Sequence, residues 1–163
     1  HFVAATNANY TVPRFLENGV YDPKPSIATI SNAMDVGNPS NFVRIQEMYQ
    51  NDLKQFEKDF SSYTFSDAAT FEAMKTIQEQ KGYIAEPHGA VGYLGLKKEL
   101  QNHPDALGIF LETAHPIKFL DIVEPALGVT LPIPSQIESV LNKEKISTKI
   151  KTYEELKAFL QNQ

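Results

Sequence analysis

Short apolar runs alternate with segments of helical periodicity through most of this sequence. Residues 2–6, 27–30, 83–85 and 107–111 have the short, apolar character of strands, and longer amphipathic segments separate them. This alternation is typical of α/β proteins, in which each helix carries the chain back over a parallel sheet. We therefore predict an α/β fold with a short parallel sheet flanked by helices.

The amphipathic segments define the expected helices. Apolar residues three or four positions apart predict one long helix over residues 42–60. A second helix is expected over residues 66–81, where Gly82 would end it, and a third from Pro87 to about Leu100. Glycines recur every three residues in the third, at positions 89, 92 and 95, and predict a flat stripe that a neighbouring element can approach closely.

A proline-containing stretch, residues 131–134, has the character of an extended linker. We expect residues 1–130 to form one unit and residues 131–163 to form a helical tail. Two matches to the S/T-x-x-E capping pattern predict helix starts in the tail. They are Ser135 with Glu138, and Thr152 with Glu155.

The composition excludes several classes of function. The chain has 15 Lys and Arg against 20 Asp and Glu, and it lacks the basic stripe that nucleic-acid binders usually carry. It has no cysteine, which excludes disulfides, thiolate zinc sites and cysteine nucleophiles. No apolar run approaches the roughly 18 residues that a membrane-spanning helix needs. We therefore expect no nucleic-acid or membrane partner. The absence of cysteine is compatible with a reducing cytosol, and we expect a cytoplasmic location.

Polar segments follow the predicted strands. In open α/β sheets, ligands bind beyond the carboxyl ends of the strands. This rule points to four segments, residues 7–9, 31–35, 86–89 and 112–116. Each also has a purely structural interpretation; the side chains of Asn7 and Asn9, for example, can bond their own turn.

Other kinds of catalytic site have weaker support. A metal hydrolase using His88, His115 and Asp35 remains an alternative, although the four histidines lack the short spacing that metal-binding pairs usually show. The G-x-S-x-G turn of serine hydrolases is missing from the sequence.

Four segments, taken in order and with their rough spacing, resemble the C-terminal half of threonine synthase. They are VAATNAN with VPRFL (residues 3–16), SNAMDV with NPSN (31–41), EPHGAV (86–91) and ETAHP with KF (112–119). The resemblance extends from residue 1 to about residue 130. Because His1 directly precedes a strand-like run, we expect the chain to be a fragment of a larger protein.

The resemblance implies a fold-type II pyridoxal-phosphate enzyme of the tryptophan-synthase-β group. Such an enzyme converts O-phospho-L-homoserine and water to L-threonine and phosphate, and its cofactor is bound to a lysine as a Schiff base. In the family, that lysine and the loop that binds the cofactor's phosphate precede the four segments. We therefore expect the fragment alone to be inactive, and to have the missing N-terminal half of the enzyme as its partner.

The resemblance also implies roles for individual residues. Thr113 is the candidate for a hydroxyl placed against the cofactor's pyridine nitrogen. Asn7, Asn9 and Arg14 are candidates for binding the substrate's phosphate or carboxylate, since arginine suits bidentate contacts with such groups. Glu86 and His88 are candidates for the floor of the pocket. Lys118 could reach a phosphate or serve only in a surface ion pair.

Two further functions remain open from the sequence. One is a threonine-synthase-like phospholyase, which eliminates phosphate and releases a 2-oxo acid. The other is a non-catalytic binding module that has kept this part of the fold. In either case, surface normally covered by a missing half would favour self-association.

Overall fold

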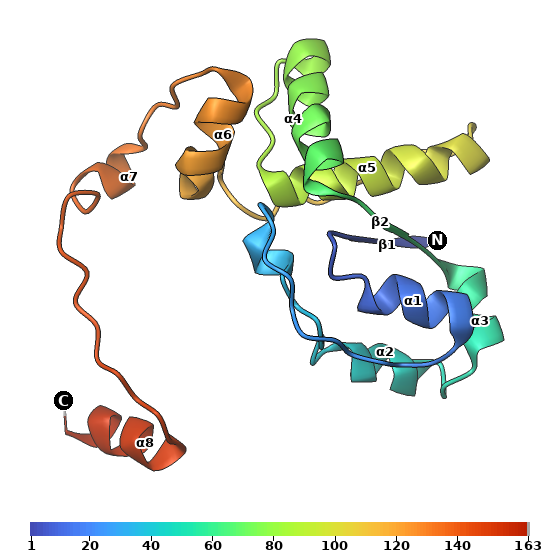
Figure 1. The fold of residues 1–163 in the computed structure, drawn as a ribbon, viewed down its shortest axis with the longest axis horizontal. Helices are drawn as coiled ribbons and strands as arrows, with labels where there is room; N and C mark the ends of the chain where they lie inside the picture. The colour runs from blue at the N-terminus through green and yellow to red at the C-terminus, as the bar shows by residue number, and fades with distance from the viewer. Residues whose placement is uncertain (163) are drawn as a thin grey trace. The chain divides into compact units, whose positions relative to one another are not determined.

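The computed structural model describes residues 1–162, and the contacts divide the chain into two compact units. The first unit is His1–Leu131 and the second begins at Pro132. The first contains a two-stranded parallel sheet and the helices that flank it (Figure 1). All of the candidate site residues lie in this first unit.

The sheet consists of β1 (Phe2–Thr6) and β2 (Phe60–Thr64), paired in parallel from Phe2 opposite Phe60 to Thr6 opposite Thr64. The predicted parallel α/β arrangement is therefore confirmed. The prediction of strands at residues 27–30, 83–85 and 107–111 is wrong, because all three segments lack regular secondary structure.

The prediction of a single helix over residues 42–60 is also wrong. The chain instead forms α2 (Phe42–Met48) and α3 (Leu53–Asp59), and β2 starts at Phe60. Between the helices, Gln50 and Asn51 have φ angles of 51° and 58°, a left-handed conformation that no α-helix can contain. Asp52 then caps α3 by accepting a hydrogen bond from the Gln55 N–H, so local polar chemistry interrupts a continuous apolar periodicity.

The other helices of the first unit follow the predictions more closely. α1 is Thr11–Asn18, and α4 (Asp67–Lys81) begins at a Ser66 cap and ends at Gly82, which has a φ of 63°. α5 (Pro87–Asn102) begins with proline, as predicted. Figure 1 shows α5 crossing the sheet on one side and α1 lying on the other.

The glycine stripe of α5 faces close neighbours, as predicted. A Cβ added at Gly95 would lie 2.6 Å from the Cβ of Ala5 in β1, so the helix and the strand approach as closely as glycine allows. The segment 106–111 lies along the same helix, with Phe110 near Gly92 and Tyr93. Its alternate side chains Leu107, Ile109 and Leu111 are 75–101% exposed, so the buried strand predicted there is instead an exposed extended segment.

This stripe gives a matched pair of stability predictions. The variant Gly95→Ala should lower the free energy of unfolding by about 1–3 kcal/mol, because the new methyl group overpacks the contact with Ala5. The variant Gly92→Ala is the control, since its Cβ would lie at an ordinary 3.7 Å from Phe110. The free energy of unfolding of this control should be unchanged or raised by up to about 1 kcal/mol, because alanine has a better helix propensity than glycine. Urea denaturation of both variants tests the pair, and equal effects would contradict it.

Two hydrophobic clusters stabilise the first unit. One joins α4 and α5 to a 3₁₀ turn (Pro116–Phe119) and α6 (Leu120–Leu127), through Met74, Ala90, Phe119 and Val123. The other is aromatic and lies under α1, α2 and α3, with Phe15, Phe42 and Phe56 at its centre.

The second unit contains α7 (Ser135–Glu138) and α8 (Tyr153–Gln161). Thr152 caps α8 as predicted, by accepting a hydrogen bond from the Glu155 N–H. The cap predicted at Ser135 is wrong, since Ser135 is already helical and Pro134 holds the cap position. Among residues 1–162, no helix combines the length and apolar character needed to cross a membrane.

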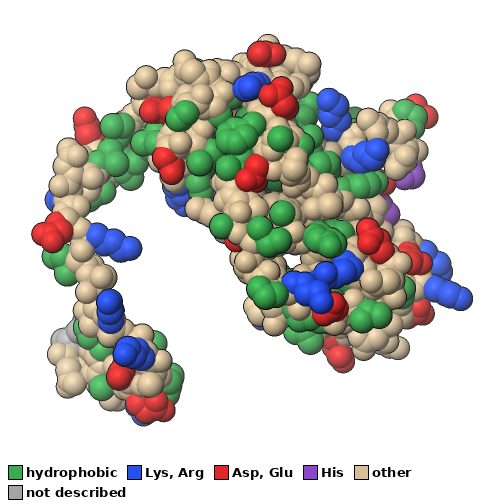
Figure 2. Space-filling model, viewed as in Figure 1, with side chains coloured by type: hydrophobic (Ala, Val, Ile, Leu, Met, Phe, Trp, Pro, Cys, Tyr) green, Lys and Arg blue, Asp and Glu red, His purple; other side chains and the backbone are tan. Residues whose placement is uncertain are grey.

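Charged side chains are spread over the surface. In Figure 2, Lys and Arg side chains are dispersed among Asp and Glu, and hydrophobic side chains gather over α4 and α6. This face therefore carries no broad basic surface, in keeping with the net charge of −5.

Candidate functional site

Asn7 lies directly after β1 and is 1% exposed. Its side-chain Nδ2 lies 2.7 Å from Thr29 Oγ1, 3.0 Å from Ser31 Oγ and 2.9 Å from Asp35 Oδ1. Its Oδ1 accepts from the backbone N–H and the side-chain amide of Asn9, both at 2.9 Å. Both ends of the Asn7 amide are thus engaged within the chain.

Asn9 extends this network to the segment after α1. Its Nδ2 donates to the carbonyl of Ile27 at 2.9 Å, and its Oδ1 accepts from the N–H of Ile27 at 2.7 Å. This pair of bonds imitates the pairing of a neighbouring strand. At Ile27, the apolar run of residues 27–30 is therefore bonded to an asparagine side chain rather than to a strand.

The side chain of Asp35 bonds back to Thr29 and to Asn7. Its carboxylate accepts from the N–H and the hydroxyl of Thr29, at 2.9 and 2.7 Å, as well as from Asn7. A 3₁₀ turn (Asn32–Met34) lies between these contacts. We call residues 27–35 the substrate-side loop, a name that refers only to the prediction from the strand-end rule that residues 31–35 form a ligand-binding segment.

Glu86 and His88 form a second polar group at the start of α5. Glu86 is fully buried, and its two carboxylate oxygens accept from the N–H groups of His88 and Gly89, at 3.0 and 2.9 Å. The same carboxylate contacts His88 Nδ1. Burial raises the pKa of Glu86, but the hydrogen bonds from the His88 ring and the two N–H groups outweigh it, so the pKa lies below its ordinary value.

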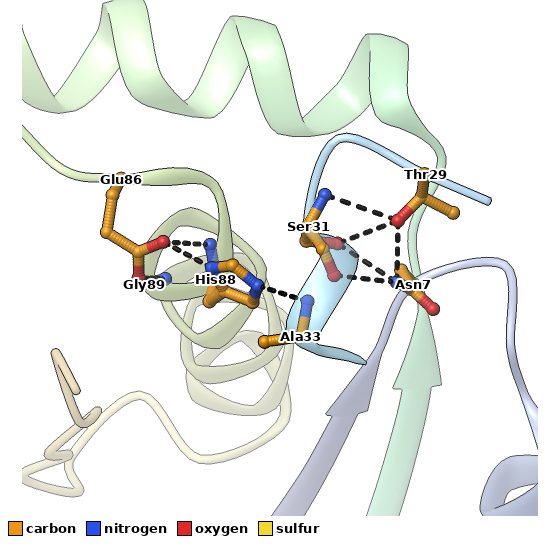
Figure 3. A network of polar contacts seen from close by, with 7 residues as sticks. All are labelled: Asn7, Thr29, Ser31, Ala33, Glu86, His88 and Gly89. Carbon is orange, nitrogen blue, oxygen red and sulfur yellow. Dashed lines mark hydrogen bonds and ion pairs between the residues drawn. The ribbon is translucent and has the colours of Figure 1, made fainter. Parts of the chain in front are cut away.

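His88 joins the two polar groups. Its Nε2 accepts from the N–H of Ala33 at 3.0 Å, so the ring proton resides on Nδ1 and points to Glu86. Figure 3 shows this bond linking the start of α5 to the substrate-side loop. The imidazole, bonded on both sides, holds the loop against the start of the helix.

Glu112 is the residue for which the sequence suggested no role. Neither of its carboxyl oxygens has a hydrogen-bond partner within residues 1–162, and both are buried. Burial, and then the charge of Glu86, raise its pKa from 4.5 to about 7, with His88 acting weakly in the opposite direction. Its position beside Thr113 in the ETAHP segment was the signal that could have identified it.

A groove of about 1070 Å³ lies between β1, α5 and the segment 106–113. Of the six candidate residues, Thr113 and His88 line it. Asn7, Asn9 and Glu86 are not among the residues that line it; Asn7 and Asn9 bond residues 27–35, and Glu86 bonds the first turn of α5. Lys58 lines the groove at the end where β1 and β2 begin.

Arg14 lies on α1, outside the groove lining. Its Nη2 donates to the carbonyl of Asp22, and its guanidinium lies 5.1 Å from the centre of the Tyr10 ring. Its Nε is buried without a partner within the described part of the chain. The guanidinium therefore retains donor capacity for an additional acceptor.

A metal site has no geometric support in the described residues. From His1 to Asn162, no three His, Asp or Glu side chains are placed to hold one ion. His88, one of the residues of the metal-hydrolase alternative, already has both ring nitrogens in contacts.

Comparisons with known proteins agree on one family. A family model described as "Threonine synthase, C-terminal" matches residues 89–160. The threonine synthase of Haemophilus influenzae is 47% identical over 137 residues, which cover 84% of this chain and 31% of that protein. The Escherichia coli enzyme is 44% identical over 136 residues, covering 83% and 31%. The chain thus spans about a third of the length of these curated relatives.

Solved structures give the same result. Threonine synthase from Escherichia coli superposes with a TM-score of 0.85 at 38% identity, over 99% of this chain and 37% of that one. PLP-bound threonine synthase from Brucella melitensis shares the fold, with a TM-score of 0.79 at 24% identity, over 98% and 39%. The fold, the order of the four segments and the sequence identity together show that this chain belongs to the threonine synthase family.

Proposed function

We propose that this chain forms one wall of the active site of a pyridoxal-phosphate-dependent threonine synthase, which converts O-phospho-L-homoserine and water to L-threonine and phosphate. The observation that carries the proposal is the groove, which brings Thr113 and His88 of two family-like segments to one surface. Pyridoxal phosphate would act there as an electron sink for carbanions.

The residues of the groove suit this cofactor. Thr113 offers a neutral hydroxyl at the groove surface, which would bond the pyridine nitrogen without supplying a charge. The volume of about 1070 Å³ suits a cofactor together with a small substrate. That a relative of this fold is a PLP-bound threonine synthase supports the assignment.

We assign substrate binding to the part of the groove that His88 lines, and Glu86 orients the His88 ring through Nδ1. Asn7 and Asn9 hold the substrate-side loop in place, so that its backbone groups are available to the substrate's phosphate or carboxylate. Arg14 lies on α1, outside the groove lining, so this assignment leaves it out.

The chain alone should lack activity. The Schiff-base lysine and the phosphate-binding loop are assigned to the portion of the relatives that this chain does not span. With pyridoxal phosphate and O-phospho-L-homoserine, the chain should therefore release no phosphate above the rate without protein. Full-length Escherichia coli threonine synthase in the same assay is the positive control. Turnover by the chain alone would contradict this division of the active site.

A complementation assay tests whether the chain and the missing N-terminal portion together form an active enzyme. The chain is co-expressed with the remaining N-terminal portion of the Haemophilus influenzae enzyme, and phosphate and threonine are measured. Activity is expected from the pair, reduced about 10²-fold or more by Thr113→Val and largely retained by Thr113→Ser, which keeps the hydroxyl. Release of a 2-oxo acid instead of threonine would identify a phospholyase. A soluble complex that binds pyridoxal phosphate but has no activity would argue against the proposed reaction.

A further inference from the structure

The carboxyl group of Glu112 contacts Gly89 on α5, and the proposed reaction gives Glu112 no role. We propose that Glu112 is a positioning residue, which as a neutral carboxylic acid on the first turn of α5 holds Thr113 at the groove surface and releases it on ionisation. The proposal concerns the same site as the proposed function and rests on it for the role of Thr113. The contact itself is a property of this chain alone.

The first support is steric. Gly89 has no Cβ, and the space that a Cβ would fill is taken by the carboxyl group of Glu112, so that the two would overlap. Glu112 therefore lies directly on the first turn of α5, which starts at Pro87. Since Thr113 follows Glu112 in the chain and lines the groove, this contact limits where the backbone of Thr113 can lie.

The second support is the pattern of hydrogen bonds. The carboxylate of Glu86 already accepts both free N–H groups of the first turn, those of His88 and Gly89. None is left for Glu112, whose buried oxygens have no partner within residues 1–162. A buried carboxylate without a donor is unfavourable when ionised, whereas a carboxylic acid is tolerated much better.

The charges around Glu112 also favour its neutral form. Glu86 and His88 face it from the start of α5, Tyr83 faces it from the preceding loop, and His115 lies two residues along its own segment. Because the charge of Glu86 disfavours ionisation of Glu112, the pair carries one negative charge most easily, and Glu86 is the better site for it because it has three donors. The pKa of Glu112, raised to about 7, agrees with this division.

The sign of the pH effect follows. In the unfolded chain Glu112 ionises near its ordinary pKa of 4.5, whereas in the folded chain it stays neutral up to a pKa of about 7. Folding therefore takes up a proton between these values, and this group's contribution to stability falls as the pH rises from 4.5 to 7. Above pH 7 the carboxylate is ionised in both the folded and the unfolded chain. In the folded chain it is then repelled by Glu86, and we expect it to leave the contact with Gly89.

The experiment is an NMR titration of the ¹⁵N-labelled chain between pH 4 and pH 9. The amide resonances of Gly89 and Thr113 should both shift in one transition with its midpoint near pH 7. In Glu112→Gln, which resembles the neutral acid in shape, both amides should stay at their low-pH positions throughout. In His115→Gln, the control, the transition should persist.

A second variant tests the contact itself. Gly89→Ala should displace the carboxyl group into water and move the midpoint to about 4.5, with the helix retained. A transition that survives in Glu112→Gln, disappears in His115→Gln, or keeps its midpoint in Gly89→Ala would overturn the proposal. None of these measurements requires cofactor, substrate or activity, so a failure here is distinguishable from a failure of the proposed reaction.

Discussion

Replacing Asn7 by alanine should lower the free energy of unfolding by about 2–4 kcal/mol and release the substrate-side loop. The Asn7 amide is buried and contacts Thr29, Ser31, Asp35 and Asn9. Its removal takes one donor from the Asp35 carboxylate and from the two hydroxyls, and leaves the buried N–H of Asn9 without its acceptor. A buried polar group left without a partner costs about 1–3 kcal/mol. Urea denaturation measures the loss, and faster amide exchange at residues 27–35 would locate it.

The matched control is Asn41→Ala. Asn41 is exposed, precedes α2 and makes no side-chain cap bond, so its loss should change stability by no more than about 0.5 kcal/mol. A loss below about 1 kcal/mol for Asn7→Ala, or a loop that exchanges as slowly as before, would show that the network is not what holds the loop.

Replacing Phe56 by alanine should lower the free energy of unfolding by about 3–5 kcal/mol. Phe56 is 2% exposed at the centre of the aromatic cluster. It stacks on Phe60 at 4.4 Å between ring centres and meets Phe15 and Phe42 edge to face. Because Phe60 begins β2, the cavity would also loosen the pairing of β2 with β1.

Two controls separate packing from the mere loss of a ring. Phe56→Leu retains most of the volume and should cost about 1.5 kcal/mol or less. Phe159→Ala removes an aromatic ring that is 39% exposed on α8, and should cost about 1 kcal/mol or less. Similar losses for Phe56→Ala and Phe159→Ala would be inconsistent with a tightly packed cluster.

The sequence predicted well the elements whose signals are local. α4 and α5 have capping residues, a terminating glycine or an initial proline, and their bounds follow these signals closely. Where two signals compete, the prediction failed. The apolar periodicity of residues 42–60 continues across Asn51 and Asp52, but the polar chemistry of these two residues turns the chain and starts a new helix.

Long-range partners were the other source of error. Residues 107–111 have the composition of a buried strand, yet burial depends on which elements cover them, and Leu107 and Ile109 are exposed here. Residues 27–30 have a similar composition, but side chains of Asn9, Asp35 and Asp67 bond their backbone instead of a neighbouring strand.

The candidate site was predicted in part. The strand-end rule selected Asn7 correctly as a residue after β1, and it also selected Glu86 and His88, although the strand assumed before them does not exist. What the sequence could not supply is the cross-chain geometry, such as the bond from Ala33 to His88. Glu112 was missed for the same reason, because its buried oxygens and its contact with Gly89 exist only in three dimensions.

The pairing of β1 with β2 has a consequence for the order of events during synthesis. Phe2 lies opposite Phe60, and at translation rates of 5–20 residues per second the second strand is made roughly 3–12 s after the first. Local helices form in microseconds, so α1 can form long before β1 has a partner. The β1–β2 pair can therefore form only after that interval, and slow codons between α1 and β2 would lengthen it.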